Sequence, residues 1–288
     1  MPASHRPYRS VLYIPGSNAR ALEKARTLPA DALILDLEDA VTPEEKPAAR
    51  ARVAGVLGQG GFGARALIVR INGLDTEWGR ADAEAMAQAS AEAVLLPKVS
   101  DPAELDALGA LVPQAALWAM METPAGILNA AAIAAHPRLA GFVLGTNDLA
   151  KELGCLHRPD RLPLITSLEL CLLAARAHGR ICIDGVYNAF RDIEGLRREA
   201  EQGRALGMDG KTLIHPAQIA VANEVFAPTA EEIELARRQI EAFEAAQAEG
   251  KGVAVVDGRI VENLHVETAR ATLAKAEAIA ALDKETAQ

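Results

Sequence analysis

The sequence predicts an α/β protein that folds as a (β/α)₈ barrel with a C-terminal helical and hairpin extension. Short apolar runs of β type recur along the first part of the chain, and Ala-, Leu-, Glu- and Arg-rich segments with helical periodicity lie between them. Alternation of strand and helix is typical of a parallel sheet. Eight such units, spaced by about 25 to 35 residues, fit a closed barrel of ordinary size better than an open doubly wound sheet, which is the alternative fold.

The expected strands and helices follow one another in a regular order. The eight apolar runs that we expect to be strands cover residues 10–14, 32–36, 66–70, 93–96, 117–121, 141–144, 180–183 and 210–214. The clearest helical segments between them cover residues 20–28, 46–57 and 164–177. Together they predict a barrel domain over residues 1–225.

The remaining residues, 226–288, differ in character and are predicted to form a separate extension. Thr229-Ala-Glu-Glu232 has the spacing of a capping box and predicts the start of a helix. A glycine-flanked apolar stretch at 252–262 predicts a hairpin, and a last helix follows it. This extension could act as a lid and contribute to a neighbouring subunit.

Charge and composition exclude several classes of function. The 288 residues include 39 acidic and 30 basic side chains, a formal charge of −9, which disfavours a nucleic acid or an anionic membrane as the partner. We find no signal-like segment or membrane-length apolar run and expect a cytoplasmic protein. The cysteines, Cys155, Cys171 and Cys182, lack metal-type spacing and are predicted to be small buried apolar residues without disulfides.

Polar residues end the predicted strands in a repeated pattern. In a barrel the carboxyl ends of all strands meet at one rim, where barrel enzymes carry their chemistry. A single acidic residue after a strand is often only a helix cap, but a whole set of polar residues at one rim favours a site. The set comprises Asp36 to Asp39, Arg70 to Asn72, Pro97-Lys98, Glu122-Thr123, Gly145 to Asp148, Asp184-Gly185 and His215-Pro216.

Glu122 and Asp148 are the candidate metal ligands within this set. They follow the fifth and sixth expected strands, which are neighbours in a barrel, so their carboxylates could approach one another. Two carboxylates suit Mg²⁺ or Mn²⁺, with water and substrate oxygens completing the coordination. General acid and base catalysis by the same pair without a metal is the competing interpretation.

Familiar nucleotide and hydrolase motifs are missing from the sequence. Gly58-Gln-Gly-Gly-Phe-Gly63 has the letters of a dinucleotide-binding fingerprint, but it follows a predicted helix and precedes a strand, so we interpret it as a loop. The sequence contains no GxSxG elbow and no P-loop.

Several ordered motifs resemble the HpcH/HpaI aldolase family over nearly the whole chain, and within it the citrate lyase beta-subunit-like branch, which includes malyl-CoA and citramalyl-CoA lyases. The motifs are Arg9-Ser-Val-Leu-Tyr-Ile-Pro-Gly16, Leu35-Asp-Leu-Glu-Asp-Ala-Val41, Arg70-Ile-Asn72, Pro97-Lys-Val99, Met121-Glu-Thr123 and Gly145-Thr-Asn-Asp-Leu149.

This resemblance implies particular roles for five residues. Glu122 and Asp148 would bind Mg²⁺, with Mn²⁺ as the alternative ion, and Glu122 would also meet the substrate. Arg70 would contact the reacting oxygens of the substrate. Tyr13 and Lys24 fall where the family contacts coenzyme A. The family also implies a homo-oligomer, a trimer or larger.

Further stretches resemble members of this branch that hydrolyse (3S)-malyl-CoA, so the expected activity is thioester hydrolysis. These stretches are Trp118-Ala-Met-Met-Glu122, Asn147-Asp-Leu-Ala-Lys-Glu-Leu-Gly154, Asp184-Gly-Val-Tyr-Asn-Ala-Phe190, Gly210-Lys-Thr-Leu-Ile-His-Pro216 and Val261-Glu-Asn-Leu-His265.

One departure from the branch bears on the reaction. Lyases of this branch generally have an aspartate where this chain has Glu262, and that aspartate acts as an acid or base, often in a neighbouring subunit. An added methylene displaces the carboxylate, and a misplacement near 1 Å can cost about a hundredfold in rate. Glu262 is therefore expected to be a general base toward water. There are two alternatives. One is carbon–carbon cleavage of malyl-CoA or citramalyl-CoA, and the other is a role as a citrate lyase beta-like subunit that needs an acyl-carrier partner.

Overall fold

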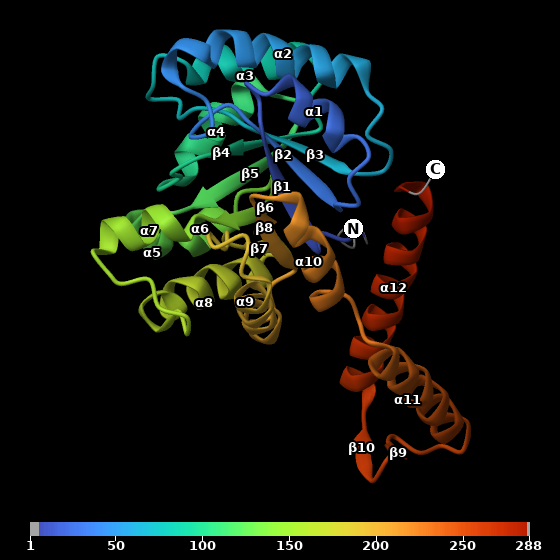
Figure 1. Cartoon of the computed structure of the whole chain (residues 1–288). Helices are drawn as coiled ribbons and strands as arrows, with labels where there is room; N and C mark the ends of the chain where they lie inside the picture. The colour runs from blue at the N-terminus through green and yellow to red at the C-terminus, as the bar shows by residue number, and fades with distance from the viewer. Residues whose placement is uncertain (1–5, 287–288) are drawn as a thin grey trace. The chain divides into compact units, whose positions relative to one another are not determined.

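A computed structural model describes residues 6–286 of the chain and contains a closed eight-stranded parallel barrel (Figure 1). Each strand pairs with the next, and the last pairs with the first. The strands are β1 (Ser10–Pro15), β2 (Ala32–Asp36), β3 (Ala66–Arg70), β4 (Ala93–Leu96), β5 (Ala116–Met121), β6 (Leu139–Leu144), β7 (Ile181–Asp184) and β8 (Gly210–Leu213). The predicted fold class is confirmed, and every predicted strand lies within two residues of an observed one.

Helices alternate with the strands and surround the barrel (Figure 1). The helices of the barrel unit are α1 (Ala19–Ala25), α2 (Lys46–Gln59), α3 (Gly79–Gln88), α4 (Pro102–Leu111), α5 (Pro124–Leu128), α6 (Ala130–Ala134), α7 (Thr146–Leu153), α8 (Leu162–Ala177), α9 (Ile193–Leu206) and α10 (Ile219–Val225). Two 3₁₀ turns, η1 (Pro43–Glu45) and η2 (Pro216–Gln218), precede α2 and α10. The helix predicted at 20–28 starts one residue earlier and ends at Ala25, after the Asn18 side chain caps its first turn.

Two apolar layers hold the barrel together. One side of each strand packs against the helices, as Leu33, Leu35 and Val69 do. The other side fills the barrel interior, where Ile34, Ile68 and Trp118 are buried. Because neighbouring side chains on a strand point to opposite faces, strands buried on both sides read as continuous apolar runs, which is why the sequence revealed them.

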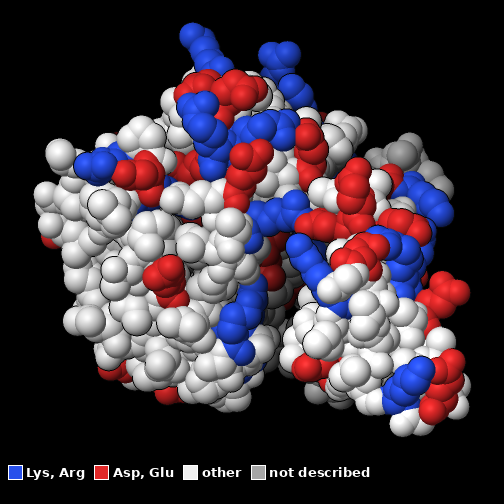
Figure 2. Space-filling model, turned by 90° about the horizontal axis from the view of Figure 1, so that it is seen from below, with Lys and Arg blue, Asp and Glu red and all other residues white. Residues whose placement is uncertain are grey.

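One flank of the barrel exposes apolar side chains. On α8 the exposed residues include Leu162, Leu170 and Leu173, with exposed fractions of 65%, 40% and 67%. Leu128 at the end of α5 is 82% exposed. The molecule seen from below has a wide area with few charged side chains (Figure 2). Exposed apolar area of this kind is typical of a contact surface.

A second compact unit begins at Ala227. It contains α11 (Ala230–Ala248), the antiparallel hairpin of β9 (Ala254–Val256) and β10 (Arg259–Val261), and α12 (Asn263–Thr286). Thr229 and Glu232 form the predicted capping box at the start of α11. A small core that includes Phe243, Val261 and Val266 joins the hairpin to the helices.

The predicted burial of the cysteines is confirmed for two of the three. Cys155, Cys171 and Cys182 are free, Cys171 and Cys182 are buried, and Cys155 is half-buried because it lies after the end of α7. Over residues 6–286, no helix combines the length and the hydropathy needed to cross a membrane.

Candidate active site

A cavity of about 290 Å³ lies at the carboxyl ends of the barrel strands. Its wall is formed by side chains that follow strands far apart in the sequence. The lining residues are Tyr13, Asp36, Asp39, Ala40, Arg70, Met120, Glu122, Leu144, Gly145, Thr146, Asn147, Asp148, Val186, Asn188 and Ile214. The rim predicted from the sequence therefore holds a real cavity, and Arg70, Glu122, Asp148 and Tyr13 all line it.

Arg70 is the buried cation of this cavity. Its Nε and Nη2 donate to the two carboxylate oxygens of Asp36 at 2.7 and 2.6 Å, and its Nη1 lies 2.7 Å from Glu38 Oε2. Nη1 also donates to Asp39 Oδ2 at 3.2 Å. The paired bonds to Asp36 fix the plane of the guanidinium, because a bidentate pair constrains orientation as well as distance.

Tyr13 packs against Arg70 on the cavity wall. The guanidinium carbon of Arg70 lies 5.0 Å from the centre of the Tyr13 ring, and the Tyr13 hydroxyl lies 3.8 Å from Met120 Sδ. Burial raises the pKa of Tyr13 above its ordinary value. The phenol therefore stays neutral and can act only as a hydrogen-bonding and packing group.

Glu122 is a buried carboxylate of the cavity with one unpartnered oxygen. It is fully buried, its Oε1 accepts a hydrogen bond from the backbone N–H of Lys98 at 2.9 Å, and its Oε2 has no hydrogen-bond partner. Burial raises the pKa of Glu122 to about 8, and the nearby carboxylates of Glu38 and Asp148 also raise it. A buried carboxylate oxygen without a partner is unfavourable unless a ligand completes the site.

The backbone around Glu122 makes room for its carboxylate. A Cβ atom at Gly145 would collide with Glu122 Oε2 and Cβ, so only glycine fits there. Gly145 directly precedes α7, whose first turn carries Asp148, so this tight approach brings the two acidic residues to the same wall.

The donors of the cavity fit a divalent cation. Four carboxylates, from Asp36, Asp39, Glu122 and Asp148, line the cavity together with Arg70. Glu38 pairs with both Arg70 and Lys98 beside it. Among residues 6–286, no group of three or more His, Cys, Asp or Glu side chains is placed to hold a metal ion. An ion on Glu122 and Asp148 would therefore need water and substrate oxygens as further ligands, which is the usual arrangement for Mg²⁺.

Three other residues of the predicted rim, Asn72, Asp184 and His215, make contacts that stabilise the fold. The Asn72 amide donates to Asp82 and Leu37 and accepts from Lys46 Nζ. Asp184 is fully buried and accepts from Lys211 Nζ and from Arg161.

The His215 ring, the third of these residues, stacks on Phe190 with ring centres 4.7 Å apart, and its Nδ1 caps the following turn. The pattern of polar residues alone could not separate these structural contacts from the site.

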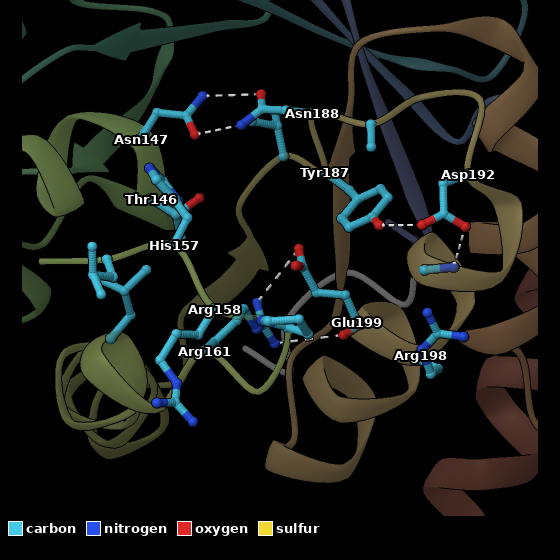
Figure 3. Close-up of a pocket in the computed structure, with 16 residues that line it drawn as sticks. Thr146, Asn147, His157, Arg158, Arg161, Tyr187, Asn188, Asp192, Arg198 and Glu199 are labelled. Carbon is cyan, nitrogen blue, oxygen red and sulfur yellow. Dashed lines mark hydrogen bonds and ion pairs between the residues drawn. The ribbon is translucent and has the colours of Figure 1, made fainter.

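Asn147 and Asn188 line the cavity, although the sequence analysis assigned neither residue a role. Their side-chain amides exchange two hydrogen bonds, of 2.8 and 3.2 Å, across the wall shared with a second cavity of about 350 Å³ (Figure 3). In that second cavity the Tyr187 hydroxyl donates to Asp192, and Arg161 lies against Glu199 (Figure 3). Both asparagines lie within family-like stretches, Asn147–Gly154 and Asp184–Phe190, and this position is the feature of the sequence that could have identified them.

Two predicted site residues, Lys24 and Glu262, are not among the residues that line the cavity. Lys24 is an exposed residue in the last turn of α1. Glu262 is exposed in the second unit, directly after β10, and its backbone N–H donates to His265 Nδ1. Their assigned roles stay predictions.

The barrel portion of the chain matches a known family over most of its length. Residues 9–216 match the family described as HpcH/HpaI aldolase/citrate lyase. The chain belongs to this family. The resemblance carried by the sequence motifs is thereby confirmed.

Relatives with named activities are similar to nearly the whole chain. The (3S)-malyl-CoA thioesterase of Cereibacter sphaeroides strain KD131 is 68% identical over 275 residues, which is 96% of each chain. Citrate lyase subunit beta of Escherichia coli K12 is 37% identical, and the similarity covers 94% of each chain.

A solved structure shows the same fold. CitE from Mycobacterium tuberculosis, in complex with magnesium, acetoacetate and coenzyme A, superposes with a TM-score of 0.80 and 32% identity. The match covers 95% of this chain and 99% of that chain. That protein was thus crystallised with magnesium and coenzyme A.

Proposed function

We propose that this HpcH/HpaI family protein is an acyl-CoA thioester hydrolase that converts (3S)-malyl-CoA to malate and coenzyme A. The observation that carries this proposal is the 68% identity to a (3S)-malyl-CoA thioesterase over 96% of both chains. The cavity is consistent with this activity. An anionic acyl group needs a cation and a fixed hydrogen-bond donor, and the cavity contains the proposed metal ligands Glu122 and Asp148 together with Arg70.

Glu122 and Asp148 are the proposed ligands of Mg²⁺, with Mn²⁺ as the alternative ion. The unpartnered Oε2 of Glu122 supports this assignment, because a cation would remove the cost of that buried oxygen. When bound, Mg²⁺ supplies Lewis-acid stabilisation and orients the oxygens of the acyl group. The solved relative that contains magnesium supports the choice of ion.

Arg70 is proposed to stabilise negative charge on the thioester oxygen. Water adds to the thioester carbonyl carbon, the C–S bond breaks, and the coenzyme A sulfur leaves with a proton. A cation held rigidly by Asp36 needs no rearrangement as charge grows on the oxygen. Since three carboxylates already face Arg70, we expect an anionic acyl group to bind well only after the metal has entered.

Glu262 is proposed as the general base that removes a proton from the attacking water. A glutamate in place of the family's aspartate shifts the carboxylate, which favours water over the carbon atom of an enolate as its partner. Its delivery from a neighbouring subunit is part of the proposal. Tyr13 and Lys24 are proposed contacts of coenzyme A, Tyr13 at the cavity wall and Lys24 from α1.

The chain is further proposed to form a homo-oligomer, a trimer or larger. The exposed leucines on α5 and α8 offer an apolar surface for such contacts. Sedimentation of the purified protein tests this state, and a monomer at micromolar concentration would refute it. The cytoplasmic location stays a prediction.

Carbon–carbon cleavage in the same cavity is the alternative, and the 37% identity to a citrate lyase subunit supports it less strongly than the 68% identity supports the thioesterase. It would release acetyl-CoA and glyoxylate instead of free thiol and malate. Quantifying the four products from (3S)-malyl-CoA and Mg²⁺ separates the two reactions. Acetyl-CoA and glyoxylate without malate would overturn the thioesterase proposal.

A further inference from the structure

Lys98 has an unusual backbone conformation beside the proposed metal site. Its φ is +54°, in the left-handed region that side chains other than glycine rarely adopt. Four non-glycine residues between positions 6 and 286 have a positive φ, at Ser90, Lys98, Arg161 and Asp257. Conformations of this kind persist only where surrounding contacts enforce them, and they are frequent at functional sites.

The main chain of Lys98 makes the hydrogen bond that holds Glu122. Lys98 follows β4 and Glu122 follows the neighbouring strand β5, and the Lys98 N–H donates to Glu122 Oε1 at 2.9 Å. This bond occupies one carboxylate oxygen and leaves Oε2 without a partner. The orientation of Glu122 therefore depends on the direction of this N–H, and hence on the backbone of Lys98.

The side chain of Lys98 is fixed at its other end. Its Nζ donates to Glu38 Oε1 at 2.9 Å, and Glu38 Oε2 lies 2.7 Å from Arg70 Nη1. The Lys98 side chain is 49% exposed, whereas that of Glu38 is 10% exposed, so the partially exposed lysine is tied to a carboxylate that is itself held in place. The contacts run without interruption from Glu122 through Lys98 and Glu38 to Arg70.

We propose that Lys98 is a positioning residue: its ion pair with Glu38 helps to keep its main chain left-handed, so that its N–H holds Glu122 in the orientation that binds a divalent cation. This inference rests on the proposed metal site and adds to it the contacts that orient one of its ligands, Glu122. Outer contacts of this kind commonly change metal affinity by about 10- to 100-fold when they are lost.

Three substitutions separate the backbone from the side chain. Lys98→Gly removes the ion pair but adopts a positive φ without strain, so Glu122 should keep its hydrogen bond. Lys98→Val removes the ion pair and strongly disfavours a positive φ, so the N–H should turn away from Glu122. Lys98→Met removes the ion pair alone and keeps an unbranched side chain.

A matched control places the same backbone strain far from the cavity. Ser90 is exposed, follows α3 and has a φ of +53°. Ser90→Val should therefore destabilise the fold as Lys98→Val does, while leaving the cavity unchanged. A common loss of metal affinity in both valine variants would mean that general destabilisation, not the placement of Glu122, is responsible.

Calorimetric titration of the full-length protein with Mg²⁺, without substrate, tests the proposal. We expect affinity within about threefold of the unchanged protein for Lys98→Gly and Ser90→Val, a loss of about tenfold or more for Lys98→Val, and an intermediate loss for Lys98→Met. Equal affinity in Lys98→Val and Lys98→Gly would overturn the backbone role. Unchanged affinity in Lys98→Met would overturn the role of the ion pair.

Crystal structures of the variants provide a test that does not need a metal. The distance from the residue 98 nitrogen to Glu122 Oε1 should stay near 2.9 Å in Lys98→Gly and lengthen beyond hydrogen-bond range in Lys98→Val. If the unchanged protein binds no Mg²⁺, the metal assignment fails, and these structures still decide whether Lys98 positions Glu122. Retention of the bond in Lys98→Val would refute the positioning role.

Discussion

Arg70 and Asp36 are paired residues at the ends of adjacent strands, joined by two parallel hydrogen bonds of 2.6 and 2.7 Å. Both side chains are nearly completely buried. The pair places a guanidinium of fixed orientation on the wall of the cavity, where a substrate oxygen can meet it. A lysine at this position would keep the positive charge but lose the fixed plane.

Arg70→Lys is therefore expected to lower kcat for (3S)-malyl-CoA by about 100-fold or more, the usual effect of losing one oxyanion donor. The charge is retained, so the affinity for Mg²⁺ should change little. Steady-state kinetics together with a Mg²⁺ titration would test this separation. A variant with a kcat within about threefold of the unchanged protein would contradict the role of Arg70.

Glu122→Gln should separate metal binding from stability. The neutral amide removes a carboxylate whose ionisation burial disfavours, so the metal-free variant should unfold at the same or a higher temperature. Excess Mg²⁺ at about 100 times its dissociation constant should stabilise the unchanged protein by about 2.7 kcal/mol. Thermal scans should show this stabilisation disappear in the variant, and a full magnesium shift would refute Glu122 as a ligand.

Gly145→Ala is expected to weaken Mg²⁺ binding by about tenfold or more, because the added methyl group must displace the Glu122 carboxylate. Gly55, within α2, offers the matched control, since a Cβ there would meet nothing within 4 Å. Gly55→Ala should raise stability by about 0.5–1 kcal/mol and leave metal binding intact. Equal magnesium affinity in both variants would show that Glu122 tolerates the crowding.

Asp184 gives the fold a defined pH dependence. Although burial disfavours its charged form, Lys211 and Arg161 outweigh this effect and lower the pKa of Asp184. A lowered folded-state pKa contributes stability above the unfolded value, about 3.9, and this contribution is lost as pH falls toward the folded value.

Asp184→Asn should consequently destabilise the protein at pH 7 by about 3–5 kcal/mol, because it leaves buried cations uncompensated. The difference between the variant and the unchanged protein should shrink as pH falls below about 4, because the aspartate of the unfolded chain then takes up a proton while Asp184 in the folded protein stays charged to lower pH. Urea unfolding at a series of pH values measures this difference. A constant difference across the whole range would contradict the assigned ion pair.

The sequence was sufficient for the barrel because its strands are buried on both faces. Runs such as 32–36 are apolar at every position but the last, and short runs of this kind between helical segments are typical of parallel strands covered on both sides. The family motifs then led to Arg70, Glu122 and Asp148, which the structure brings to one cavity.

The individual side-chain contacts of the rim could not be predicted from the sequence. Asp184 is neutralised by Lys211 and Arg161, which lie more than 20 positions away, and no local pattern reveals such partners. The same holds for the left-handed backbone of Lys98 and for its hydrogen bonds with Glu38 and Glu122. When a charged residue ends a strand, its partners in the folded structure determine whether it belongs to the functional site or only stabilises the fold.

The most direct test of the proposed function is product analysis of the purified protein with (3S)-malyl-CoA and Mg²⁺. Free thiol, malate, acetyl-CoA and glyoxylate would be quantified with and without a chelator. We predict equal amounts of thiol and malate, formed only in the presence of the metal. Formation of acetyl-CoA and glyoxylate, or thiol release that persists with the chelator, would contradict metal-dependent thioester hydrolysis.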